Sequence, residues 1–334
     1  MSRYLIFILA AMLVIGSSWG AEYHIRDLGI LGEANDINDA GQVVGLSGYP
    51  FIWQNGSVNY LTSLGGTATP EAINSNGQVV GLYMPVYPNN HAFLWQDGVM
   101  QDLGTLGGSN SHAFGINDSG QVVGSSGTAD GHGHAFLWQN GIMHDLGTLG
   151  GLTSGASAIN NAGQIVGGSG HAFMWQGGSM QDLGTLGVSW SEAMAINDKG
   201  QVVGHSDIND LEYAFFWEPG SPMQNLGTLG GLESTAFDVS DSGQVVGSAN
   251  TTTGSRHAFV WQDGVMQDLG TLGGSYSVAS AINNSGIIAG SANDASGNTH
   301  AVLWEPVPEP SSLLALGVGL GAVGIPFIRR RRNW

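Results

Sequence analysis

The sequence contains no cysteine and few basic residues. Without cysteine, the chain has no disulfide, no thiolate nucleophile and no cysteine-based zinc site. Lys and Arg together number 8 against 26 Asp and Glu, which gives a formal net charge of −18 in 334 residues. A chain this acidic is not expected to bind nucleic acid, because phosphate backbones are held by basic surfaces. Charged residues are only 10% and hydrophobic residues 42%, a composition too apolar for a disordered chain.

Between the two ends of the chain, the sequence has no helical periodicity.

At the N-terminus, residues 1–20 have the pattern of a secretory signal peptide: Arg3, then an apolar core over 4–16, then the small residues Ser18 and Gly20. We expect cleavage after Gly20. The apolar run is short for an uncleaved membrane anchor, which is the alternative.

The C-terminus has three parts in a fixed order. A Pro-rich break comes first, then an apolar, Gly-rich run over 313–328, then four arginines. Sixteen helical residues span about 24 Å, less than the ~30 Å of a hydrocarbon core. The run is therefore expected to anchor the chain transiently in the inner membrane, with the arginines on the cytoplasmic side.

This tail, residues 307–334, resembles the PEP-CTERM sorting signal of Gram-negative bacteria. The resemblance rests on Pro308-Glu309-Pro310, the apolar run and the arginine cluster Arg329, Arg330, Arg331 and Arg332. It implies export, an envelope or exopolysaccharide setting, and an exosortase-type processing protease as a partner. The sequence leaves open whether the tail is removed.

The body of the chain, residues 21–306, is an internal repeat. Gly-Gln-Val-Val-Gly or a close variant begins seven times, at Gly41, Gly77, Gly120, Gly163, Gly200, Gly243 and Gly286. Each unit of about 43 residues holds four short runs rich in Val, Ile, Phe and Trp, separated by Asn, Asp and Gly. In one unit these runs are 113–117, 121–125, 134–138 and 142–146.

Four strands in each of seven units predict an all-β, seven-bladed β-propeller of four-stranded blades. The first run, 23–28, is of the fourth type and the last, 300–304, is of the third type. The N-terminal strand is therefore expected to complete the last sheet and close the ring. A β-solenoid is the alternative, although no capping segment is visible.

The repeat also resembles the HAF family of extracellular repeats, through His-Ala-Phe at 91–93, 134–136, 171–173 and 257–259 and Asp-Leu-Gly-Thr-Leu-Gly at 102–107, 145–150, 182–187 and 268–273. The motif is altered at 49–51, 213–215 and 300–302. The family implies export and a repeat fold, but no particular chemistry. We expect the repeated histidines to be structural and the repeated aspartates to bind local backbone amides.

Functional residues are expected where the repeat breaks down, on the face that carries the links between units and the loops between second and third runs. The candidate ligand-binding residues are aromatic and polar side chains that could stack on sugar rings and bind hydroxyls: Tyr83, Tyr87, Trp190, His205, Asp207, Asp210, Glu212 and Tyr276. His205, Asp207 and Asp210 are weak candidates for a cation such as Ca²⁺. No other cofactor is indicated.

The sequence thus favours a non-catalytic binding or structural protein of the cell surface, periplasm or exopolysaccharide matrix, with a glycan as the partner. With 25 acidic and three basic residues in 21–306, a polyanion site is not expected. One alternative is a glycan hydrolase or lyase, for which the candidate carboxylates are Glu71, Glu192, Asp207, Glu212 and Glu233; no spacing pairs them. Another is a purely structural spacer.

Overall fold

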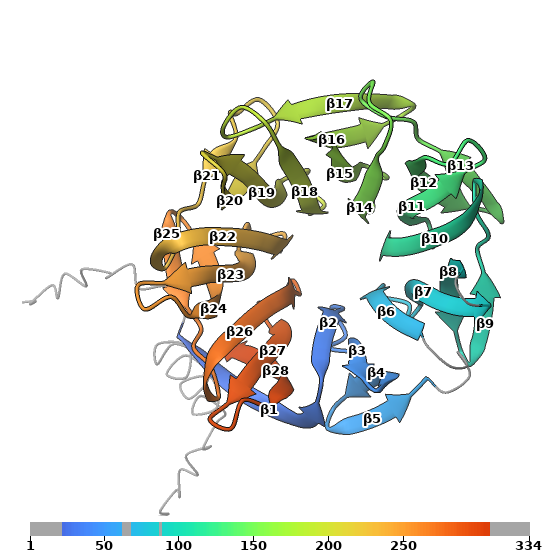
Figure 1. The fold of residues 1–334 in the computed structure, drawn as a ribbon. Coiled ribbons are helices and arrows are strands. Elements are labelled where there is room, and N and C mark those ends of the chain that lie inside the picture. The colour runs from blue at the N-terminus through green and yellow to red at the C-terminus, as the bar shows by residue number, and fades with distance from the viewer. Residues whose placement is uncertain (1–21, 62–67, 87–88, 308–334) are drawn as a thin grey trace, which may run out of the picture. The chain divides into compact units, whose positions relative to one another are not determined.

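The computed structural model describes residues 22–61, 68–86 and 89–307, and strands are its only regular elements. The compact unit Tyr23–Val307 is a ring of β-sheets around a central channel (Figure 1). The prediction of an all-β propeller is confirmed, and the ring excludes a solenoid. The predicted signal peptide, residues 1–20, and residues 308–334 of the tail lie outside the described residues.

Five sheets are four-stranded blades, and each is named here after its innermost strand. The β2 blade contains β2 (Glu33–Ile37), β3 (Val43–Ser47), β4 (Tyr49–Gln54) and β5 (Ser57–Tyr60). The β6 blade contains β6 (Ala68–Ile73), β7 (Val79–Val86), β8 (Asn89–Gln96) and β9 (Val99–Asp102). The β10 blade contains β10 (Gly107–Ile116), β11 (Val122–Thr128), β12 (Gly133–Gln139) and β13 (Ile142–Asp145). The β14 blade contains β14 (Gly155–Ile159), β15 (Ile165–Ser169), β16 (His171–Gln176) and β17 (Ser179–Gly184). The β18 blade contains β18 (Ser191–Ile196), β19 (Val202–Ile208), β20 (Leu211–Trp217) and β21 (Gln224–Asn225).

The other eight strands form a single sheet. They are β22 (Gly230–Val239), β23 (Val245–Thr251), β24 (Arg256–Gln262), β25 (Val265–Asp268), β26 (Gly273–Ile282), β27 (Ile288–Asp294), β28 (Thr299–Pro306) and β1 (Tyr23–Leu31). The prediction of seven four-stranded blades is therefore wrong, because the structure has five. The last two repeats are joined by a parallel pairing of Arg256 in β24 with Tyr276 in β26. The repeat pattern of the sequence does not predict this parallel pairing, because the pairing forms only where β26 extends into the link between the last two repeats.

The N-terminal strand closes the ring. β1 pairs antiparallel with β28, from Tyr23 opposite Pro306 to Leu31 opposite His300. This pairing, which was expected from the order of the repeated runs, is confirmed. Closure leaves the seven innermost strands β2, β6, β10, β14, β18, β22 and β26 around one channel (Figure 1).

Turn chemistry explains why the repeats form hairpins. Between third and fourth strands, Asn140 and Gly141 both have positive φ, at 52° and 81°. This is the conformation of a two-residue type I′ turn, which Asn-Gly favours. Gly124 serves a different purpose: a Cβ on it would lie 1.9 Å from the carbonyl oxygen of His112, because the inner strand bulges towards it there.

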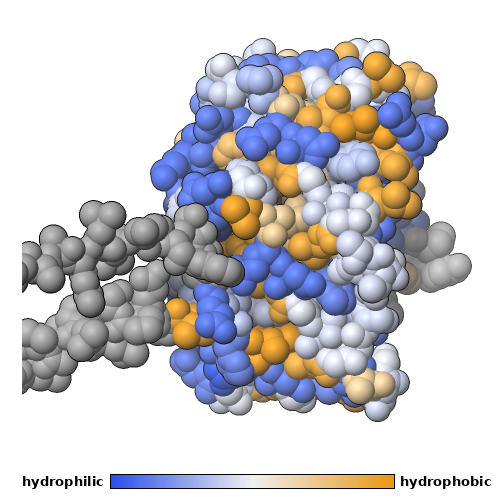
Figure 2. All heavy atoms as spheres, turned by 90° about the vertical axis from the view of Figure 1, so that its left-hand side faces the viewer, coloured by the Kyte–Doolittle hydropathy of each residue, from blue (hydrophilic) through white to orange (hydrophobic). Residues whose placement is uncertain are grey.

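The core lies between neighbouring blades. One cluster contains Val80 and Ala92 of the β6 blade together with Val122, Phe136 and Trp138 of the β10 blade. The Phe of the repeat is fully buried wherever it occurs, at Phe51, Phe93, Phe136, Phe173, Phe215 and Phe259. Away from the channel, the outer side of the ring near β21 and β25 mixes small hydrophobic groups with hydrophilic ones (Figure 2). The sheet faces that touch other sheets therefore supply the apolar core.

A ring of asparagines links the sheets around the channel. Each Asn side chain donates to the backbone carbonyl of the equivalent residue in the next repeat, over 2.9 to 3.2 Å. The donors are Asn38, Asn74, Asn117, Asn160, Asn197 and Asn283. Ser240 stands at the seventh position, and its hydroxyl contacts Ser242 instead. The Asn is therefore constant in six of the seven repeats because it links one repeat to the next.

Ser240 suggests a test of this ring. The variant Asn117→Ser should keep the local turn but lose the bond from Asn117 to Asn160, because Ser is too short to reach the next sheet. We expect a loss of about 1 kcal/mol in the free energy of unfolding, measured by urea denaturation. Ser119→Ala, an exposed change in the same turn, is the control. Equal stability of both variants would contradict a role for the ring.

Candidate functional site

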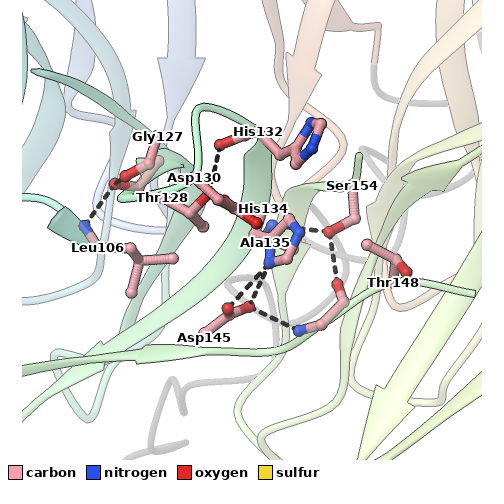
Figure 3. A network of polar contacts seen from close by, with 12 residues as sticks. Leu106, Gly127, Thr128, Asp130, His132, His134, Ala135, Asp145, Thr148 and Ser154 are labelled. Carbon is pink, nitrogen blue, oxygen red and sulfur yellow. Dashed lines mark hydrogen bonds and ion pairs between the residues drawn. The ribbon is translucent and has the colours of Figure 1, made fainter. Parts of the chain in front are cut away.

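The repeated histidine and aspartate belong to one structural network (Figure 3). The Nδ1 of His134 lies 2.9 Å from Asp145 Oδ2, across β12 and β13. Asp145 Oδ1 accepts the backbone N–H of Gly147. Ser154 then joins this link to the next blade, because its hydroxyl accepts from Ala135 N–H and donates to the Gly147 carbonyl. The expected bonding of the repeated aspartates to backbone amides is thus confirmed.

The same network recurs around the ring. Equivalent His–Asp contacts of 2.8 to 3.0 Å pair His91 with Asp102, His171 with Asp182 and His257 with Asp268. His300 Nδ1 lies 3.0 Å from Asp27 Oδ2, so the closing strand supplies the partner there. The aspartates of these pairs also accept backbone N–H groups of the links, so the pairs hold the links in position.

Because the strands of each blade alternate in direction, the molecule has two faces. The loop face carries the links between blades and the connections from second to third strands. The opposite face, called here the turn face, carries the asparagine ring. Each face opens into its own pocket in the channel.

The pocket at the turn face, of about 190 Å³, is built from repeated residues. Its outer ring contains Asp118, Asn161 and Asp198, and each side chain accepts a backbone N–H from the preceding repeat. In the described residues, no group of three or more His, Asp or Glu side chains is arranged to bind a metal ion. These carboxylates therefore join neighbouring repeats.

The pocket at the loop face, of about 630 Å³, is built from residues that differ between repeats. This channel pocket is lined by residues of all seven inner strands and by one residue of the second strand β11: Glu33, Asn35, Thr69, Glu71, Phe114, Ser125, Gly155, Ala156, Ser157, Glu192, Met194, Phe237, Val278 and Ser280. Its volume is within the range of small-molecule sites. It combines aromatic walls with carboxylate, amide and hydroxyl groups, and it is the strongest candidate for a binding site.

Glu71, which lines the channel pocket, contacts a histidine of the adjacent blade that is not itself a lining residue. His112 Nε2 of β10 lies 3.0 Å from Glu71 Oε1 of β6, and both side chains are half-buried. The His112 ring also packs on Phe114, with ring centroids 4.0 Å apart. This packing fixes Phe114, whose side chain is 37% exposed, at the edge of the pocket.

A second group of titratable residues lies on the β18 blade. Burial, with the nearby carboxylate of Glu212, raises the pKa of Glu192 above its usual value. Burial lowers the pKa of His205, with the Arg256 charge acting in the same direction and Glu212 opposing it. The His205 ring lies 4.8 Å from the Trp190 ring, and its buried Nδ1 has no hydrogen-bond partner in the described part of the chain. Glu192 is the member of this group that lines the channel pocket.

Two further carboxylates occur at the bulge of an inner strand, Asp36 in β2 and Asp238 in β22. Each accepts a backbone N–H from the next repeat, Ile73 for Asp36 and Ile282 for Asp238, at 2.8 Å. Burial raises the pKa of Asp36 to about 7, with the Asp238 charge contributing, and raises that of Asp238 to about 6. Four of the other five repeats have Ala at this position, as at Ala72 and Ala195, and the fifth has Gly115.

The predicted loop residues are only partly brought together. Tyr83 is buried, and its hydroxyl donates to Asp102 over 2.8 Å, so it belongs to the core. Asp207 accepts from Ser189 and from the Trp190 N–H, and Asp210 lies in the tight turn after β19 with a φ of 66°. Glu212 is exposed, and Tyr276 is 40% exposed beside Arg256.

Tyr87 lies outside the described residues. Trp190 and His205 pack together, but His205, Asp207 and Asp210 are not part of any three-residue metal group in the described chain. Of the five candidate catalytic carboxylates, Glu71 and Glu192 line the channel pocket, whereas Asp207, Glu212 and Glu233 do not.

Sequence reasoning missed most of the channel pocket. Asn35, Phe114, Met194 and Phe237 occupy one repeated position, three residues before the Asn of the ring or its Ser240 counterpart. The signal was available: this position varies within a motif that is otherwise nearly constant. The repeat period alone does not show that the side chain at this position faces the channel axis, because that depends on how the inner strand curves.

Comparisons with known proteins support the fold and the tail. Residues 306–332 match the PEP-CTERM protein-sorting motif. No curated protein matches the chain. A chain from the crystal structure of the mitotic checkpoint complex has a TM-score of 0.56 and 16% identity, covering 92% of this chain and 99% of that one.

Two other structures are similar at lower scores. TolB from Acinetobacter baumannii has a TM-score of 0.46 and 11% identity. The match covers 85% of this chain and 63% of the TolB chain. XC5397, a gluconolactonase from Xanthomonas campestris, has 0.44 and 12% over 86% of this chain and 90% of its own. At these identities the similarity concerns the fold alone.

The protein is therefore an exported β-propeller protein with a C-terminal membrane-anchoring sorting signal, and that signal is a substrate signal for exosortase processing. No helix in residues 22–61, 68–86 and 89–307 is long and apolar enough to cross a membrane.

The raised pKa values of Asp36 and Asp238 predict a pH dependence. Both lie above the unfolded value of 3.8, so the folded state binds extra protons and loses stability as the pH rises through about 6 and about 7. The double variant Asp36→Ala/Asp238→Ala adopts the residue of other repeats and should remove this decline.

Unfolding in urea between about pH 5 and pH 8 measures the effect, which we expect to exceed about 1 kcal/mol for the parent chain relative to the variant. Asp97→Asn in an exposed turn is the control. If the double variant loses stability with pH as steeply as the parent, the two carboxylates are not responsible.

Proposed function

We propose that this protein is a non-catalytic binding protein of the cell surface or exopolysaccharide matrix, and that it binds a saccharide unit in the channel pocket. The single observation that carries the proposal is the composition of that pocket. It joins Phe114 and Phe237 to the polar side chains of Asn35, Thr69 and others within about 630 Å³. Aromatic rings that face the apolar side of a sugar, with amide and hydroxyl groups for its hydroxyls, suit such a ligand.

The positions of the chain ends support this proposal. Tyr23 and Pro306 pair with each other, and both lie near Gly286 in a turn of the turn face. The chain therefore enters and leaves the ring on the face opposite the channel pocket. The loop face, where the channel pocket opens, therefore carries neither Tyr23 nor Pro306.

The sorting motif supports the location. An exported chain with a sorting tail is expected to stay in the envelope until processing near Pro308, Glu309 and Pro310 releases it. We propose that the apolar run 313–328 anchors it transiently and that the cell surface or the matrix is its destination.

A glycan hydrolase or lyase is the second candidate, and one observation favours it. Glu192 has a raised pKa beside the exposed carboxylate of Glu212, and unequal carboxylates of this kind can divide acid and base roles. Release of reducing sugar from the ligand, abolished by Glu192→Gln, would support an enzyme. Binding without any turnover favours the binding protein.

Binding is tested with the full-length chain on an array of bacterial exopolysaccharides and simple glycans. Phe114→Ser takes the residue found at the equivalent position Ser157 and should weaken binding about tenfold, the loss of roughly 1.4 kcal/mol of stacking.

The control is Val265→Ser, a change on an exposed outer strand, and this variant should bind like the parent chain. Saccharide binding that survives Phe114→Ser unchanged would contradict the assigned pocket. Absence of binding to every glycan, by a chain that folds, would contradict the function.

The tail gives a separate prediction. Replacing Pro308, Glu309 and Pro310 together by Ala should leave the tail attached, because the sorting motif is no longer read. Mass spectrometry of the protein from its own host should then show the full C-terminus, whereas the parent chain should end near these residues. A parent chain that keeps its tail in a host with active exosortase would contradict processing.

A further inference from the structure

The wall of the channel pocket carries negative charge that its own residues do not neutralise. Glu33, Glu71 and Glu192 line it, and none of the lining residues is Lys, Arg or His. Arg256 is not among the lining residues, and its guanidinium donates through Nε to Ser248 and through Nη2 to Thr235. An anionic ligand would therefore be repelled, and a cationic one attracted.

Two of these carboxylates are available to a ligand. In the described residues, the side-chain carboxylates of Glu33 and Glu192 have no hydrogen-bond or ion-pair partner, whereas that of Glu71 contacts His112. Burial and the nearby carboxylate of Glu212 raise the pKa of Glu192. Glu192 is half-buried and Glu33 is exposed, so a ligand can reach both carboxylates, and a cationic ligand would favour the ionised form of Glu192.

The aromatic side chains of the same pocket suit a cation as well as a sugar. Phe114 and Phe237 lie on different inner strands of the lining. The face of an aromatic ring attracts a nearby ammonium group. The remaining polar groups, from Asn35, Thr69 and Ser280, are neutral and can bind hydroxyls.

We propose that the channel pocket binds an amino sugar whose amine is free and protonated, with the ammonium held by Glu192 and Glu33 and the ring packed against Phe114. This inference rests on the proposed function and names the class of saccharide. A sugar with an acetylated amine lacks the charge, and an acidic sugar has the wrong sign. In this arrangement the neutral polar groups bind the hydroxyls of the sugar, and the unpaired carboxylates bind its ammonium group.

Isothermal titration calorimetry of the full-length chain tests the proposal with four probes: glucosamine, N-acetylglucosamine, glucose and methylammonium. The pH is set below the pKa of the glucosamine amine. We expect glucosamine to bind at least about tenfold more tightly than glucose or N-acetylglucosamine, and more tightly than methylammonium. Its affinity should fall as salt is added, because the attraction is between charges.

Charge-neutralising variants locate the contact. Glu192→Gln and Glu33→Gln should each weaken glucosamine binding about fivefold to tenfold and leave glucose binding unchanged. The matched control is Asp97→Asn, which removes one carboxylate from an exposed turn where other repeats carry Asn55 and Asn140. It should bind like the parent chain. The salt dependence of the parent protein tests the same attraction without any substitution.

The outcomes separate this inference from the proposed function. Glucose binding as tight as glucosamine binding, without salt dependence, would overturn the amine and leave a saccharide-binding pocket. Methylammonium binding as tight as glucosamine would overturn the sugar. If no probe and no glycan on the array binds, the proposed function fails as well.

Discussion

The pairing of β1 with β28 is the constraint on which the rest of the structure depends. Twenty-eight strands can surround a channel only if the last sheet is completed by the first segment of the ring. An open arrangement would leave two sheet faces without a partner, and the apolar clusters between neighbouring sheets require a partner on both sides. Closure also completes the asparagine ring, since Asn283 reaches the carbonyl of Asn38 from the opposite end of the chain. The channel and its pockets are consequences of this one pairing.

Repeated and variable residues have different tasks in this ring. The repeated Asp, Ser and Asn side chains bind backbone groups within the links and between neighbouring repeats. The repeated His–Asp contacts recur with nearly the same distances. The variable residues gather where the inner strands face the axis on the loop face. Because seven similar units point there from seven directions, a pocket of mixed chemistry is assembled from side chains that are distant in sequence. Glu33 and Glu192 are 159 positions apart in the chain and line the same space.

The electrostatics of the channel follow from a shortage of cations. Only Arg26, Lys199 and Arg256 supply permanent positive charge in residues 21–306. Arg26 pairs with Glu305 on the outer strands and Arg256 is bound to hydroxyls, so the carboxylates at the axis keep their mutual repulsion and their desolvation. Burial is the main cause of the raised pKa values of Asp36, Glu192 and Asp238, and a neighbouring carboxylate adds to it at Asp36 and at Glu192. The preference of the channel for a neutral or cationic occupant is thus a property of the whole ring.

The sequence by itself determined the all-β class, the closing role of the N-terminal segment and the sorting tail, because each depends on local patterns: two-residue turns, runs of four to six β-formers, and the order Pro-Glu-Pro, apolar run, arginines. It also indicated the loop face, at which the structure has the channel pocket. Only the tertiary structure decided that Tyr83 is buried, that β24 joins β26 in one sheet, and that Phe114, Phe237 and Glu33 line a pocket. The physical reason is that a repeat period fixes which residues are equivalent, whereas strand twist and the bulge in each inner strand fix which of them turn towards the axis.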